Sequence, residues 1–180
     1  MVMKVRLEYS VFQTDWGQVV AVWSDSGLWE LSFPRPTVDE AVSDITAPLK
    51  NIRSGQVTNA AAQELQLELN MYFRGFNTPF SVPVDWRGYT PFQQKVLKLT
   101  AAIPYGSITT YGTIAKQAGS PKAARAAGGA LHSNRTPIVV PCHRVVGSNG
   151  KLTGFGGGLD MKKALLMLEK NIATASHDRI

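Results

Sequence analysis

Alternating hydrophobic and polar positions mark the first part of the chain and predict β-strands. Hydrophobic side chains recur at every second position over 5–11, and two β-prone runs follow at 19–23 and 28–33. The turn signals Asp15-Trp16-Gly17 and Asp25-Ser26-Gly27 separate these segments. Because short polar turns join neighbouring antiparallel strands, we expect a three-stranded antiparallel meander.

Helical periodicity follows the meander. One helix is expected over 38–53, disturbed by Pro48, and a second over 60–73, with residues 80–86 extended after it. The apolar face of the second helix would consist of Leu65, Leu69 and Tyr72. The pattern predicts an α/β supporting domain over residues 1–87, built on a small antiparallel sheet with helices.

From residue 88 the chain changes character and predicts a mainly helical second domain, 88–180. Thr90-Pro91-Phe92 is expected to start a helix, with Pro91 in the first turn where no donor is lost, and the helix should end at 104–106. Its apolar stripe would consist of Val96, Leu99 and Ala102. A short helix over 110–118 and another from Ser120-Pro121 to about His132 resemble a helix-turn-helix.

The last part of the chain holds one apolar run and one more helix. Residues 138–140 have the composition of a buried strand. Asp160 is expected to cap a helix that reaches about Asn171. The apolar stripe of this helix would consist of Met161, Leu165 and Leu168.

Composition narrows the possible chemistry. Nineteen Lys and Arg against thirteen Asp and Glu give a net charge of +6, which favours a polyanionic partner. One cysteine excludes an internal disulfide, cysteine-rich zinc sites and iron–sulfur clusters, and three histidines leave little for any metal. No apolar run reaches the roughly 18 residues that span a bilayer, and no secretory signal is visible. We expect a cytoplasmic protein without a metal or a membrane partner.

The helix expected from Pro121 carries long cations beside small residues. One face would hold Lys122, Arg125, Gly129 and His132. Such a face could approach a phosphate backbone closely while Arg125 projects beyond it. The same pattern also fits an Ala/Gly-rich helix packed on a neighbour, with solvated cations outside.

The single cysteine lies in the segment Pro141-Cys142-His143-Arg144-Val145. An adjacent base or positive charge lowers a thiol pKa, so Cys142 is a candidate nucleophile; a small buried side chain is the alternative. Neighbouring residues on a strand point to opposite faces, so contact between Cys142 and His143 would need a water or an irregular turn.

Two further features could belong to the same site. Glu169 lies at the edge of the apolar stripe of the last helix, where His143 would be its natural partner if it is buried. A solvated glutamate at a helix end is the alternative. The glycine-rich segment 153–158 lacks the spacing of a phosphate loop and indicates either close backbone approach to a flat group or a flexible loop.

Taken in order, these motifs resemble the O6-alkylguanine-DNA alkyltransferase family, the methylated-DNA–protein-cysteine methyltransferases. The resemblance is complete at 141–145, specific from Thr90 to Glu169, and weak over 1–87. Its supporting segments are Tyr105-Gly106, Thr110-Tyr111-Gly112, Ile114-Ala115, 121–130, Asn134, 153–158 and Leu168-Glu169.

The resemblance implies DNA repair by direct reversal, with no cofactor. An alkyl group would pass irreversibly, once per protein, from O6-alkylguanine in double-stranded DNA to Cys142. His143 would take the thiol proton through a water, Glu169 would orient His143, and Tyr111 would assist base flipping and donate a hydrogen bond to the leaving guanine. The family pattern implies a monomer and leaves O4-alkylthymine activity and cooperativity on DNA open.

The resemblance also assigns binding residues. Its DNA-binding set is Tyr111, Lys122, Ala124, Arg125, Gly128 and Gly129, with Arg125 filling the gap left by the flipped nucleotide. Its substrate-binding set is Leu131, Asn134, Val145, Phe155, Gly156 and Gly157. Phe155 and Gly156 replace a tyrosine and a serine of some relatives, which puts the preferred alkyl size in doubt. Arg135 replaces a proline and would add a cation near the DNA face.

Three other functions remain compatible with parts of this pattern. A non-catalytic lesion-binding relative would lack the acceptor Cys142. A helix-turn-helix regulator would have no need of Glu169 on an apolar edge. A cysteine hydrolase with a Cys/His pair would turn over repeatedly, so the stoichiometry of the reaction separates it from a single-turnover transferase.

Overall fold

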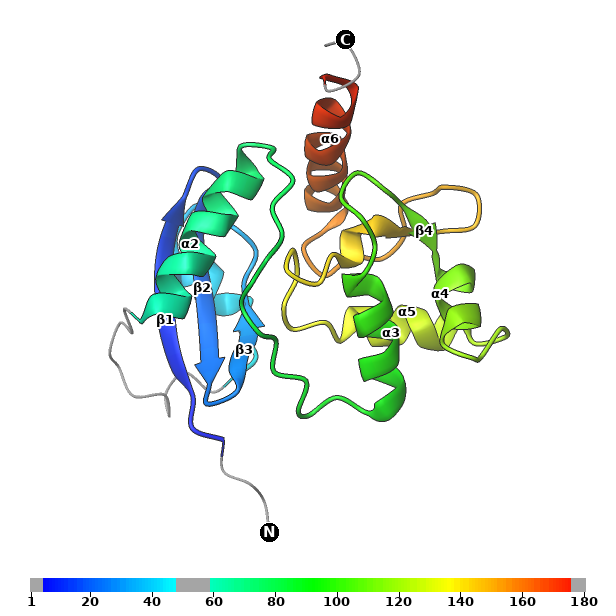
Figure 1. The fold of residues 1–180 in the computed structure, drawn as a ribbon, viewed down its shortest axis with the longest axis horizontal. Coiled ribbons are helices and arrows are strands. Elements are labelled where there is room, and N and C mark those ends of the chain that lie inside the picture. The colour runs from blue at the N-terminus through cyan, green and yellow to red at the C-terminus, as the bar shows by residue number, and fades with distance from the viewer. Residues whose placement is uncertain (1–4, 48–58, 176–180) are drawn as a thin grey trace. The chain divides into compact units, whose positions relative to one another are not determined.

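The computed structural model describes residues 5–47 and 59–175, with side chains as far as residue 170. The chain divides into two compact units, Met1–Trp86 and Arg87–Ile180. The sequence had placed this boundary between residues 87 and 88. We call them unit 1 and unit 2 and describe each by itself (Figure 1).

Unit 1 is built on a three-stranded antiparallel sheet, as the alternating pattern predicted. Its strands, in sheet order, are β1 (Glu8–Thr14), β2 (Gly17–Ser24) and β3 (Gly27–Leu31). Gly27 closes the second turn with a φ of +134°, and a Cβ there would lie 2.2 Å from the carbonyl oxygen of Pro83. Only glycine fits at that position.

The segment after unit 1's second helix extends the sheet. The helix α2 (Ala60–Phe73) begins at its predicted residue, with the Asn59 side chain accepting the Ala62 N–H at 2.8 Å, and its predicted apolar face is buried. Residues 80–86 are extended as predicted where they pass β3, because Leu28 N donates to Pro83 O at 2.8 Å and Asp85 N to Leu28 O at 2.9 Å.

The first helix of unit 1 is shorter than predicted. α1 covers Val38–Ser43, and the expected continuation beyond residue 47, including Pro48, lies outside the described residues. The helix ends because the next backbone donors have other acceptors. Thr46 N and Ala47 N both donate to the buried Glu30 carboxylate, at 2.7 and 3.0 Å.

Unit 2 is mainly helical, as predicted. Thr90 and Gln93 form a reciprocal capping box at the start of α3, and α3, α4 and α5 pack against one another. β4 and β5 form a short parallel pair. The elements in chain order are α3 (Pro91–Ala101), β4 (Thr109–Thr110), α4 (Tyr111–Gln117), α5 (Ala124–His132), the 3₁₀ turn η2 (Cys142–Arg144), β5 (Val145–Val146) and α6 (Leu159–Ala175).

Two helical predictions in unit 2 need correction. The helix α5 begins at Ala124 rather than Pro121, because Ala123 N bonds to Ser120 O at 2.9 Å in a turn and Ser120 provides no side-chain cap. Lys122 therefore lies outside the helix. In α3 the buried residues are Val96, Leu97 and Thr100, while the predicted Leu99 is half-buried and Ala102 exposed.

The apolar run before Cys142 is a turn and not the predicted strand. Ile138 has a φ of +73°, Val139 N bonds to Pro137 O, and Cys142 N bonds to Val140 O. These short-range bonds lead the chain directly into η2.

The last helix also differs from its prediction. α6 starts at Leu159, so Asp160 lies in its first turn and does not precede it, and the helix continues to Ala175. Among its residues up to 170, the fully buried ones are Lys162, Leu165 and Glu169, so this inward face is rotated from the predicted stripe. None of the described helices is long and apolar enough to cross a membrane.

Candidate active site

The segment around Cys142 is held in a strained but buried conformation. A β-branched residue with positive φ costs on the order of 1–3 kcal/mol, and Ile138 tolerates it because its side chain is only 1% exposed within the core. After this turn, Cys142 occupies the first position of η2. Its side chain is half-buried, while His143 is fully buried.

Asn134 connects this segment to the end of α5. Its side-chain Nδ2 donates to Cys142 Sγ at 3.2 Å and to Val140 O at 2.9 Å. Its Oδ1 accepts the Thr136 N–H at 3.1 Å. The structure thus places Asn134, a predicted substrate-binding residue, directly against the thiol.

The Glu169 carboxylate is the centre of a buried polar cluster. Glu169 is 1% exposed, and its Oε1 lies 2.7 Å from His143 Nε2. Arg144 Nε donates to Oε2 at 3.0 Å and Nη2 to Oε1 at 3.0 Å, and the Gly106 N–H donates to Oε2 at 3.0 Å. With a carboxylate on Nε2, the neutral imidazole carries its proton there and Nδ1 is the basic atom.

The burial of this cluster sets its protonation. Burial raises the pKa of the Cys142 thiol above its ordinary value, against the hydrogen bond from Asn134 and the positive charge of Lys162, which lower it. Burial lowers the pKa of His143, although the hydrogen bond that the imidazole donates to Glu169 opposes this. At neutral pH the site therefore holds a thiol and a neutral imidazole. The lowered thiol pKa suggested by the adjacent His143 is wrong for this state.

Lys162 is the polar residue that sequence analysis missed. It is fully buried, and its Nζ donates to Val145 O at 2.6 Å and to Thr153 O at 3.2 Å. Burial lowers its pKa and the charge of the Cys142 thiolate would raise it. Its spacing of seven residues from Glu169 places both on one helix face, a signal that could have revealed it.

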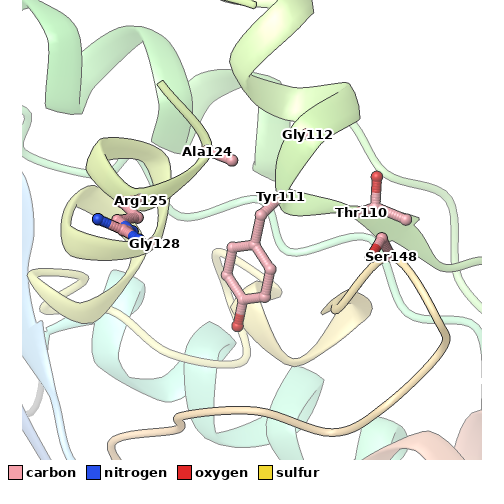
Figure 2. Close-up of a pocket in the computed structure, with 7 residues that line it drawn as sticks. All are labelled: Thr110, Tyr111, Gly112, Ala124, Arg125, Gly128 and Ser148. Carbon is pink, nitrogen blue, oxygen red and sulfur yellow. The ribbon is translucent and has the colours of Figure 1, made fainter. Parts of the chain in front are cut away.

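A cavity of about 420 Å³ adjoins the first turn of α4. Figure 2 shows the Tyr111 ring between α5 and the loop that carries Ser148. Its lining residues are Thr110, Tyr111, Gly112, Ala124, Arg125, Gly128 and Ser148. Four of these belong to the predicted DNA-binding set, and Cys142 is not among them.

The Tyr111 side chain links this cavity to the glycine-rich segment. Its hydroxyl donates to Thr153 O at 3.2 Å, and Lys162 Nζ lies 5.8 Å from its ring centroid and 5.8 Å from that of Phe155. A Cβ on Gly128 would lie 3.8 Å from the Tyr111 ring. Tyr111 of α4 and the glycine-rich segment therefore meet around Lys162 of α6.

The remaining predicted residues are more scattered. Lys122 and Gly129 are exposed and do not line the cavity, whereas Leu131 is 7% exposed inside the unit. Val145 is buried in β5, and Phe155 and Gly157 are half-buried. A Cβ at Gly129 or Gly156 would meet no atom within 4 Å, so both glycines leave open space for an approaching molecule. In the described part of the chain, no three His, Cys, Asp or Glu side chains group together as metal ligands would.

Comparisons with known proteins agree on one family. The model for the 6-O-methylguanine DNA methyltransferase, DNA binding domain, matches residues 91–171. A methylated-DNA–protein-cysteine methyltransferase of Methanosarcina acetivorans is 38% identical over 161 residues, which cover 89% of this chain and 97% of the relative. A methylated-DNA–protein-cysteine methyltransferase of Mycobacterium bovis is 56% identical over 108 residues. The matched segment covers 60% of this chain and 65%, just under two thirds, of that relative.

Solved structures lead to the same family. The crystal structure of Mycobacterium tuberculosis O6-methylguanine methyltransferase matches with a TM-score of 0.72 and 40% identity, covering 92% of this chain and 93% of that one. The same organism's OGT in complex with DNA matches with a TM-score of 0.69 and 39% identity, covering 91% and 93%. On these similarities, which extend through both units, the chain belongs to the methylated-DNA–protein-cysteine methyltransferase family.

Proposed function

We propose that this chain repairs double-stranded DNA by moving an alkyl group from O6-alkylguanine to Cys142, once per protein molecule. The observation that carries the proposal is the buried His143–Glu169 pair, 2.7 Å apart, next in sequence to the only thiol of the chain. Family membership and the cavity beside α5 support the DNA part of it.

The proposed chemistry is a one-step displacement. The Cys142 proton passes to His143 Nδ1 through an intervening water, and Glu169 stabilises the resulting imidazolium. The thiolate sulfur attacks the O-alkyl carbon, so a C–S bond forms as the C–O bond breaks and its electron pair stays on the guanine O6. Because the product is a thioether, which does not return to a thiolate, each protein reacts once.

The neutral thiol of the free protein fits this sequence of steps. A thiolate without substrate would be exposed to side reactions, whereas a proton transfer coupled to substrate binding creates the nucleophile only when it is needed. Asn134 and Lys162 lower the pKa of Cys142 and stabilise the anion at the moment of attack.

DNA binding is proposed for the cavity and the exposed face of α5. The target base must leave the stack before its O6-alkyl carbon can reach a protein nucleophile. Arg125 projects from α5 at the rim of the cavity, where it can occupy the space of the extruded nucleotide, and Gly128 and Gly129 permit close approach of the backbone. Tyr111 would exchange its hydrogen bond with Thr153 for one to the departing guanine.

The direct test is Cys142→Ala. The substitution removes one half-buried sulfur atom, so the fold should survive, and DNA binding should persist because phosphate contacts lie elsewhere. Methyl transfer from a duplex that contains O6-methylguanine should vanish completely, with duplex binding by fluorescence anisotropy as the control. Residual transfer by the alanine variant would rule out Cys142 as the acceptor.

A further inference from the structure

One contact in unit 2 takes no part in the steps above. The backbone N–H of Arg135 donates to the Tyr89 hydroxyl at 2.8 Å, and the Arg135 guanidinium carbon lies 4.3 Å from the centroid of the Tyr89 ring. Arg135 Nη2 also donates to the carbonyl oxygen of Arg87 at 2.6 Å. The sequence had suggested a cation near the DNA face, but this guanidinium has partners within its own unit.

Both residues are well placed to fix the neighbouring Asn134. Tyr89 is 9% exposed, so its hydroxyl and ring act in a largely desolvated setting, where hydrogen bonds and cation–π contacts are stronger than at the surface. The hydroxyl binds the amide that directly follows Asn134, and Thr136 N binds Asn134 Oδ1 on the other side. The turn that carries Asn134 is thus held at two successive amides.

The position of that turn matters for the thiol. Asn134 Nδ2 donates to Cys142 Sγ at 3.2 Å. A displacement of the turn by about a few tenths of an ångström would lengthen and weaken this hydrogen bond. We propose that Tyr89 and Arg135 form a clamp that positions the Asn134 amide against Cys142 Sγ and so sets the reactivity of the thiol. They are positioning residues, because they act on the thiol through Asn134.

The alternative is that the clamp only supports the fold. The two explanations differ in what they predict for the pH dependence of thiol reactivity. A structural contact, when removed, lowers stability or slows every reaction equally. Loss of a positioning contact weakens the hydrogen bond to the thiolate, so the pKa of Cys142 rises while the intrinsic reactivity of the thiolate is unchanged.

The test is the pH profile of Cys142 alkylation by iodoacetamide, followed by mass spectrometry. Tyr89→Phe keeps the ring and removes the hydroxyl, and Arg135→Met removes the guanidinium and keeps an aliphatic chain. Each should raise the apparent thiol pKa by about 0.5 to 1 unit, the effect of weakening one hydrogen bond, and slow neutral-pH alkylation about three- to ten-fold. The alkaline plateau should stay unchanged.

Matched controls come from unit 1. Tyr9→Phe removes a tyrosine hydroxyl, and Arg74→Met removes the partner of the exposed Asp15, so both should give the wild-type profile. Wild-type profiles in Tyr89→Phe and Arg135→Met would overturn the proposal. Equal slowing at every pH, or melting of both variants below the assay temperature, would overturn it too, because either result means a structural role.

The clamp rests on the proposed function only in taking Cys142 as the reactive group. Iodoacetamide alkylation measures the reactivity of the Cys142 thiol in the absence of DNA and alkylguanine. If the wild-type protein reacts with iodoacetamide but not with alkylguanine DNA, the proposed function fails while the clamp stands. If transfer occurs but the profiles do not shift, the clamp alone fails.

Discussion

Both units bury carboxylates, and Glu30 of unit 1 and Glu169 of unit 2 have different partners. Glu30 in unit 1 is 3% exposed and accepts hydrogen bonds from Thr46 N, Thr46 Oγ1 and Ala47 N, at 2.7, 2.8 and 3.0 Å. Glu169 in unit 2 is 1% exposed and binds His143, Arg144 and the Gly106 N–H. The described donors to Glu30 are neutral, whereas Glu169 binds two ionisable side chains beside the thiol.

This difference separates a structural carboxylate from a candidate catalytic one. Neutral backbone and hydroxyl donors can hold a loop in place, as Glu30 holds the segment after α1, but they offer no proton that moves near neutral pH. An imidazole does, and Glu169 is bound to one whose neighbour in sequence is Cys142. Burial alone would have marked both carboxylates equally, so the partners decide which one belongs to an active site.

The largest expected effect comes from neutralising each carboxylate in turn. Glu169→Gln keeps the shape but removes the charge that stabilises the His143 imidazolium, so transfer at neutral pH should slow about 100-fold or more. Glu30→Gln should leave the transfer rate unchanged and lower only the free energy of unfolding. Single-turnover rates and urea unfolding of both variants check this, and equal loss of rate in the two would remove the distinction.

The next effect separates DNA handling from chemistry within unit 2. Arg125→Ala should slow repair of duplex DNA about 10- to 100-fold, because base extrusion costs a few kcal/mol that the side chain helps offset. Reaction with the free base O6-benzylguanine needs no extrusion and should hardly change. Lys122→Ala, outside the cavity, removes the same charge and should lower duplex affinity modestly, with a shallower salt dependence, while leaving the reaction with O6-benzylguanine unchanged. If Arg125→Ala slows duplex repair and the reaction with O6-benzylguanine by the same factor, Arg125 supports the fold of the active site and does not assist base extrusion.

A smaller effect is expected from the buried lysine. Lys162→Met removes the positive charge that lowers the pKa of Cys142, so the apparent thiol pKa should rise by about one unit and transfer at neutral pH should slow about ten-fold. The exposed neighbour Lys163 provides the control, Lys163→Met. Ultraviolet titration of the thiol in both variants measures the shift, and coincident curves would place Lys162 outside the electrostatics of the site.

The smallest effect lies in the pH dependence of stability. Burial raises the folded pKa of Cys142 above the ordinary value of a thiol, about 8.5, so above that pH the unfolded chain loses a proton that the folded chain keeps. Unfolding then becomes easier as the pH rises through this range. Cys142→Ala removes this contribution, and its unfolding midpoint should fall less between pH 8 and pH 10 than that of the wild type. Parallel curves would contradict the raised pKa.

Sequence patterns predicted much of the fold because the relevant signals are local. The start of α3 at Thr90-Pro91 and the apolar face of α2 depend on residues within a few positions of one another. The hydrogen bond between Glu169 and His143 could also be predicted from the sequence, because a buried carboxylate at the edge of an apolar stripe needs a hydrogen-bond donor.

The missed features depend on contacts between distant segments. Lys162 looks like a solvated lysine in sequence, and its burial requires carbonyl groups from Val145 and Thr153 that only the folded unit brings together. The composition of 138–140 is that of a strand, yet Ile138 adopts a positive φ because the turn bonds around it outweigh β-propensity. Ser120-Pro121 has the chemistry of a helix start, but the helix begins at Ala124.

The most direct test of the account follows a labelled methyl group. The protein is incubated with an excess of duplex that carries O6-methylguanine labelled in the methyl carbon, and the label is counted and located by peptide mass. We expect saturation near one methyl per protein, all of it as a thioether on Cys142, with none on the Cys142→Ala variant. Continued turnover with release of the label, or a methyl group on any other residue, would contradict it.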